Sequence, residues 1–72
     1  MNTNIISMTL AEKLAKNLIA LRGEQTQGVF ARKLGISRAT LNRLESVSQN
    51  TTLKTLEQIT TSLNCEIGNL FK

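Results

Sequence analysis

The chain has 72 residues, which is enough for one small domain, and hydrophobic residues make up 40% of it, as expected for a chain that folds. Because it contains no histidine and a single cysteine, we expect no metal ion or other cofactor: a four-ligand zinc site, a disulfide framework and a histidine-based catalytic triad are all excluded. The formal net charge is +4.

This positive charge is concentrated in the middle of the chain. Between Arg32 and Lys54 there are five basic residues and one acidic residue, Glu45, whereas acidic and basic residues are equal in number elsewhere. A local basic segment favours binding to a phosphate backbone, since neutralised phosphates release counterions. An ordinary solvated basic surface would give the same charge pattern.

The first predicted element is a helix that begins at a capping box. Thr9 and Glu12 have the spacing at which each side chain bonds the other residue's backbone amide. Leucines at 10, 14, 18 and 21 recur at helical spacing and predict one buried stripe, and Gly23 ends the helix after Arg22. We expect residues 1–8 to form a flexible arm and residues 9–72 to form the domain.

Two short helices are predicted next. Thr26 can cap a helix that starts at Gln27, and Gly35 is suited to the positive φ of the turn that ends it. Ser37 can cap the following helix. The predicted inward positions of the two helices are Phe30, Ala31, Leu34, Leu41 and Leu44.

The polar segment 46–51 reads as a loop, after which Thr52 can cap a fourth helix. Its predicted inner stripe consists of Leu53, Leu56, Ile59 and Leu63. A short final helix carrying Ile67, Leu70 and Phe71 would cover the core, with Cys65 as a small apolar residue beside it. The sequence therefore predicts an all-α domain of five helices.

Two short helices joined by a tight glycine-containing turn are the sequence form of a helix-turn-helix. The run from Thr26 to Glu45, TQGVFARKLGISRATLNRLE, resembles the helix-turn-helix of the phage repressor and Cro family, also called the Xre family. The resemblance extends to residues 18–22, 52–63 and 67–71. It implies a lambda-repressor-like bundle that binds double-stranded DNA.

The resemblance also implies roles for individual residues. The positions that match base-reading residues are Ser37, Arg38, Ala39 and Arg43. The positions that match contacts to the DNA backbone are Gln27, Thr40, Asn42, Ser48, Gln49, Asn50 and Thr52. Arg22 and Glu45 match a structural ion pair. The chemistry agrees, since arginine can donate two hydrogen bonds to guanine and small polar side chains suit phosphates.

One departure from the family pattern concerns the end of the third helix. The family commonly has glycine two residues after the glutamate, whereas this chain has Val47, a β-branched residue that resists positive φ. We therefore expect the third helix to end differently.

The function that these residues predict is a cytoplasmic, sequence-specific transcriptional repressor that binds a palindromic operator as a homodimer. The alternative is an antitoxin-like protein that binds a partner protein, such as a toxin, and autoregulates its operon. An enzyme has little support, because the chain has no aspartate or histidine for acid-base chemistry. We expect no membrane association, since no apolar run approaches the length of a membrane span.

Overall fold

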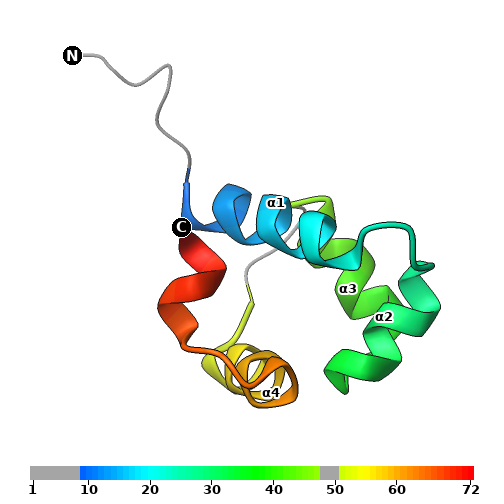
Figure 1. Ribbon diagram of the computed structural model, residues 1–72. Coiled ribbons are helices and arrows are strands. Elements are labelled where there is room, and N and C mark those ends of the chain that lie inside the picture. The colour runs from blue at the N-terminus through cyan, green and yellow to red at the C-terminus, as the bar shows by residue number, and fades with distance from the viewer. Residues whose placement is uncertain (1–8, 48–50) are drawn as a thin grey trace.

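The computed structural model describes residues 9–47 and 51–72, and within these ranges the chain is helical, with no strand. The elements are α1 (Leu10–Arg22), α2 (Gln27–Leu34), α3 (Arg38–Glu45), α4 (Leu53–Leu63) and the 3₁₀-helix η2 (Ile67–Phe71) (Figure 1). The predicted all-α class is confirmed. The predicted count of five helices is not matched, because the last segment is a 3₁₀ rather than an α-helix. The predicted arm, 1–8, lies outside the described residues.

Each α-helix that the structure describes begins at a hydroxyl side chain. The side chain oxygen of the cap residue accepts a hydrogen bond from the backbone amide three residues further on, which satisfies an amide that has no partner within the helix. The caps are the predicted residues Thr9, Thr26, Ser37 and Thr52. At Thr9 the capping box is complete, since the Glu12 carboxylate accepts a hydrogen bond from the Thr9 amide.

Gly35 ends α2 in the left-handed conformation, with a φ of +77°. A side chain at this position would collide with Gln58 of α4. The same region ties α2 to α4, because Ser62 Oγ and Gln58 Nε2 both donate hydrogen bonds to the Leu34 carbonyl, at 2.8 and 3.3 Å. Gly35 is therefore favoured by its backbone conformation, and a side chain here would also have to displace the end of the Gln58 side chain.

Val47 corrects one prediction about the end of α3. It adopts a φ of +58°, in the left-handed region that its β-branched side chain disfavours. The chain thus makes a left-handed turn two residues after Glu45, at the position where glycine would be unstrained. The Val47 side chain lines an apolar groove with Leu44 and Leu56.

The core lies where the helices meet. It consists of Leu14, Leu18, Phe30, Ala31, Leu34, Leu41, Leu44, Leu56, Ile59 and Leu70, with Ile36, Leu63, Cys65 and Phe71 packed against it. The residues of this core lie at predicted inward positions, whereas Ala15, which is also buried, was not predicted.

Three leucines predicted to be buried are exposed instead. Leu10 and Leu53 expose 65% and 74% of their surface, and Leu21 is also exposed. Leu10 and Leu53 are the first residues of α1 and α4, and Leu21 is next to the last residue of α1. Helical spacing fixes the direction in which a side chain points, but not how far along the helix a neighbour covers it. Ile67 of η2 is likewise exposed.

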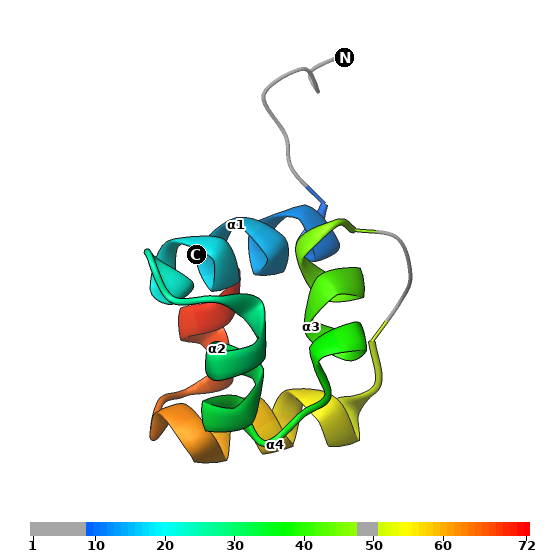
Figure 2. The same cartoon turned by 90° about the vertical axis from the view of Figure 1, so that its right-hand side faces the viewer.

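Figures 1 and 2 show α1 at one end of the bundle and α4 at the other, with the α2–α3 pair spanning the distance between them. On a different side η2 connects the same two helices, and Asn17 Nδ2 of α1 donates a 2.8 Å hydrogen bond to the Leu70 carbonyl. No helix in ranges 9–47 and 51–72 is long and apolar enough to cross a membrane.

Candidate nucleic-acid interface

The α2–turn–α3 unit has one buried face and one exposed face. Leu41 and Leu44 of α3 are buried against the core, and the turn is held by a 3.1 Å hydrogen bond from the Ile36 amide to the Ala31 carbonyl. The side chains on the outer side of α3 are exposed: Arg38, Ala39, Asn42 and Arg43. Figure 2 shows α2 and α3 side by side on the surface of the molecule. The α3 helix can therefore present its polar face to a large partner.

The predicted base-reading residues at the start of α3 are exposed. Ser37 is exposed at the cap position, followed by the exposed Arg38 and Ala39. The stem of Arg38 extends over the first turn of α2, where a Cβ built on Gly28 would lie 3.8 Å from Arg38 Cδ. A methyl group at position 28 would make only an ordinary van der Waals contact with this arginine.

Ser37 already has two local hydrogen bonds. Its Oγ accepts from the Thr40 amide at 3.0 Å and donates to Thr40 Oγ1 at 2.8 Å. In this arrangement Ser37 can still accept a hydrogen bond through its remaining lone pair, but it has no proton left to donate. Among the base-reading candidates, Ser37 thus also caps the helix that carries them.

A hydrogen-bonded network lies where α1, α2 and α3 meet. Arg22 Nε donates to Glu45 Oε2 at 2.8 Å, which is the ion pair that the sequence predicted. Gln27 Nε2 donates to Glu45 Oε1 at 2.8 Å and to Asn42 Oδ1 at 3.3 Å. Arg22 Nη1 also donates to the Gln25 carbonyl. The carboxylate of Glu45 therefore faces inward to protein donors.

This network constrains how Gln27 could contact DNA. An amide nitrogen carries two protons, and both protons of Gln27 Nε2 are directed at Glu45 and Asn42. Since a phosphate only accepts hydrogen bonds, Gln27 must exchange one of these partners to bind it. The bond to Asn42 is the longer of the two and is the one more easily exchanged.

The second part of the predicted interface follows α3. Ser48, Gln49 and Asn50 lie outside the described residues. Thr52 is described, and its Oγ1 accepts from the Thr55 amide and donates to Thr55 Oγ1, both at 3.1 Å. Thr52 is exposed and caps α4, whose first backbone amides, apart from that of Thr55, have no partner within the helix and can bind an anion.

Several supporting residues were not predicted from the sequence. Gln58, Ser62 and Asn17 each bond a carbonyl of a distant helix. Polar residues on an otherwise amphipathic helix look alike whether they bond a neighbouring helix or water. No pattern within one helix could therefore have identified them.

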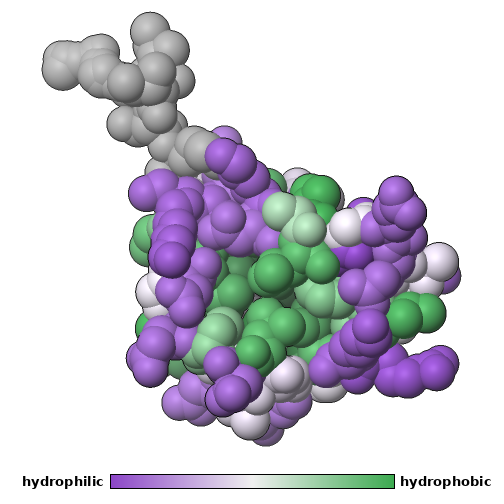
Figure 3. Space-filling model, in the orientation of Figure 1, coloured by the Kyte–Doolittle hydropathy of each residue, from purple (hydrophilic) through white to green (hydrophobic). Residues whose placement is uncertain are grey.

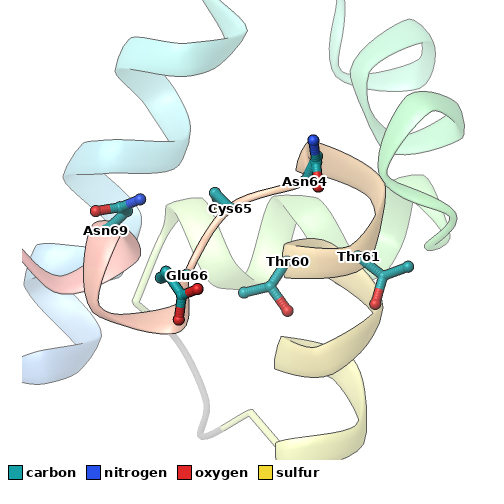
Figure 4. Close-up of a pocket in the computed structure, with 6 residues that line it drawn as sticks. All are labelled: Thr60, Thr61, Asn64, Cys65, Glu66 and Asn69. Atoms are coloured by element: carbon teal, nitrogen blue, oxygen red, sulfur yellow. The ribbon is translucent and has the colours of Figure 1, made fainter.

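Two adjoining hollows lie away from α3. One, of about 380 Å³, lies between α1 and η2 and is lined by Leu21, Leu63 and Leu70 among others. The other, of about 490 Å³, is more polar and is shown in Figure 4, with Asn64 and Asn69 on its rim. Cys65 and Asn69 line both. Within the described part of the chain, no group of three or more His, Cys, Asp or Glu could hold a metal ion.

Comparison with known proteins bears on the same residues. A family model described as a Cro/C1-type HTH DNA-binding domain matches residues 13–72. The match begins within α1 and includes α2, α3, α4 and η2. Comparison with curated proteins and comparison with solved structures gave no match.

Proposed function

Because the chain belongs to the family of Cro/C1-type helix-turn-helix DNA-binding domains, we propose that it is a sequence-specific transcriptional repressor. The observation that carries the proposal is the exposed outer face of α3, on which two arginines flank a small alanine while the opposite face is buried. An α-helix of this kind fits the major groove of DNA, where the base edges differ between base pairs.

In this proposal the start of α3 reads the bases. Arg38 and Arg43 donate paired hydrogen bonds to guanine, and the methyl group of Ala39 contacts a thymine methyl. Ser37 accepts a hydrogen bond from a base amino group, since its own proton is used within the protein. These contacts provide sequence discrimination.

The surrounding polar residues bind the phosphates on either side of the groove. The candidates are Gln27, Thr40, Asn42, Ser48, Gln49, Asn50 and Thr52. Gln27 gives up its bond to Asn42 when it binds a phosphate, and this also frees Asn42. Contacts of this kind set the orientation of the protein on the duplex and depend strongly on salt.

We further propose that the protein acts as a homodimer on a palindromic operator, because a single module covers only roughly 600 to 1,000 Å² of protein surface on DNA. The hollow lined by Leu21 and Leu63 is the candidate interface. Apolar surface gathers in the hollow framed by α1, η2 and α4 on the face seen in Figure 3. None of the described residues that line this hollow is charged, so two copies can meet without repulsion.

The orientation of the hollow relative to α2 and α3 supports the proposed homodimer. The hollow faces the viewer in Figures 1 and 3. The α2 and α3 helices face the viewer in Figure 2, which is rotated by 90°. Two subunits that meet through the hollow could therefore both direct α3 at the same DNA duplex. Ile19 of α1 and Ile67 of η2, which are exposed on the two elements framing it, are further candidates for contact.

The experiment that tests the function is selection of bound sequences from a random pool of duplex DNA. A repressor of this kind yields one enriched motif with two inverted half-sites about one helical turn (~34 Å) apart. A motif with one half-site argues against the dimer. Recovery of random sequences would refute base reading, and a second protein co-purifying from native cells would favour the antitoxin-like alternative.

A promoter assay then tests repression. With the selected operator between a promoter and a reporter, expression of the protein should lower reporter output, and scrambling one half-site should restore it. We propose that the protein acts in the cytoplasm, because in a cell that lacks a nucleus the DNA lies there. Higher output from the intact operator would identify an activator instead.

A further inference from the structure

An apolar groove that the proposed DNA-binding surface does not use lies between the start of α1, the end of α3 and the end of η2. It has a volume of about 200 Å³ and is lined by Leu10, Leu14, Leu44, Val47 and Phe71, among others. Of the described residues that line it, all are apolar except Thr51.

Thr51, which is the polar residue among the described lining of this groove, has an unpaired hydroxyl group. The hydroxyl oxygen of Thr51 is buried and finds no hydrogen-bond partner in the described part of the chain. Burial of a hydroxyl without a partner is unfavourable, because the group loses its hydrogen bonds to water. The groove thus offers an apolar surface together with one unused hydrogen-bonding group, which is what an extended peptide segment can satisfy.

The segment best suited to the groove is attached to its edge. Leu10 lines the groove, and residues 1–8 precede it in the chain with only Thr9 between them. This segment carries the apolar residues Ile5, Ile6 and Met8 and no charged side chain. The other segment outside the described ranges, 48–50, consists of serine, glutamine and asparagine.

Residues 1–8 are long enough to reach the groove. An extended chain spans at most roughly 3.3 to 3.6 Å per residue, so Ile6 can lie up to about 10 Å from Thr9. This reach covers the first turns of α1, where Leu10 and Leu14 form one side of the groove. A backbone amide or carbonyl of the segment can then bond the Thr51 hydroxyl.

We propose that residues 1–8 dock in the groove of their own chain, with Ile5 or Ile6 against Leu44 and Phe71 and a backbone group paired with the Thr51 hydroxyl. The docked segment joins the start of α1 to the connection between α3 and α4. It stabilises the strained turn at Val47 by covering the apolar side of that residue. This role is independent of DNA binding.

The first test is thermal unfolding of the chain with residues 2–8 deleted. We expect its melting temperature to fall by about 4 to 8 °C, the shift that loss of a modest stabilising contact gives in a domain of this size. Replacing Ile5 and Ile6 together by serine should give a similar fall. The matched control, Asn2 and Asn4 both replaced by serine, should melt like the parent chain.

A substitution at Thr51 tests the hydrogen bond. Thr51→Val removes the hydroxyl and keeps the shape. In the full chain it should lower the melting temperature, because the docked segment loses its polar partner. In the truncated chain it should raise the melting temperature, because an unpaired buried hydroxyl is removed. A shift of the same sign in both chains would overturn the proposed bond.

Nuclear Overhauser effects locate the segment directly. We expect contacts from the methyl groups of Ile5 or Ile6 to the ring of Phe71 and none to the buried ring of Phe30. Absence of the Phe71 contacts, or equal melting of the truncated and full chains, would overturn the proposal. Contacts that appear only between differently labelled chains in a mixed sample would show that the segment docks on a second copy, which also overturns docking within one chain.

Discussion

Arg22 Nε lies 2.8 Å from Glu45 Oε2, and this ion pair joins the last residue of α1 to the last residue of α3. The side chain of Glu45 is only 6% exposed, and its other oxygen accepts a hydrogen bond from Gln27 at the start of α2. One carboxylate therefore bonds side chains from the two helices that support α3. The orientation of the proposed recognition helix depends on this contact.

Replacing Glu45 by alanine should destabilise the fold. The substitution removes the acceptor of Arg22 Nε and of one proton of Gln27 Nε2, and the expected loss is about 1.5 to 3 kcal/mol of unfolding free energy. Urea unfolding followed by circular dichroism measures it. Glu45→Gln, which keeps one acceptor oxygen, should lose less. If Glu45→Ala unfolds at the same urea concentration as the parent chain, the ion pair is not structural.

Arg38→Ala and Arg43→Ala should each weaken binding to the selected operator by roughly 1 to 3 kcal/mol and binding to random DNA far less, because the lost contacts are to bases. Fluorescence anisotropy at several salt concentrations gives both affinities. Arg32→Ala is the matched control, since it removes the same charge from an exposed position on α2. Equal losses on operator and random DNA would reassign Arg38 and Arg43 to phosphate contacts.

Gly35→Ala should lower stability by about 1 to 2 kcal/mol or more, because alanine is strained at a φ of +77° and its methyl group would displace Gln58. Gly68→Ala is the control. Gly68 has no positive φ, and a Cβ there meets no atom within 4 Å. Comparable melting temperatures for the two variants would contradict this explanation of the turn.

Val47→Asn should increase stability by about 1 kcal/mol, since asparagine tolerates the left-handed conformation far better than valine does. Val29→Asn makes the same change at a similarly exposed valine whose φ is not positive, and it should give no gain. Thermal unfolding distinguishes the two variants. A loss of stability at Val47 would mean that its apolar contacts in the groove outweigh the strain.

Leu21→Glu should abolish the proposed dimer, because two carboxylates would meet in the uncharged hollow. Sedimentation equilibrium measures the mass of the assembly. The control is Leu53→Glu, which makes the same substitution at the start of α4. The cysteine of the chain gives a second measurement, since Cys65 lines the same hollow. Its reaction with a maleimide should slow as protein concentration rises in the parent chain but not in Leu21→Glu. A dimer that survives Leu21→Glu would exclude this interface.

Local sequence patterns determined the helices and their caps. Thr9, Thr26, Ser37 and Thr52 cap the α-helices that the structure describes because each provides a hydroxyl beside an amide that lacks a helical partner. These interactions span three residues and can be read from neighbours in the chain. For the same reason the exposed face of α3 was predictable, whereas its contacts with DNA await experiment.

Tertiary packing decided what depends on distant residues. Leu10 and Leu53 share the spacing of buried leucines, yet no described neighbour covers them, and Val47 accepts a positive φ within the turn toward α4. Gln27 bonds Glu45 and Asn42 because two helices bring these side chains together. Sequence by itself set the local hydrogen bonds and the direction of each side chain. Only the assembled bundle determined which of those side chains found a partner, since burial depends on surfaces that come from other parts of the chain.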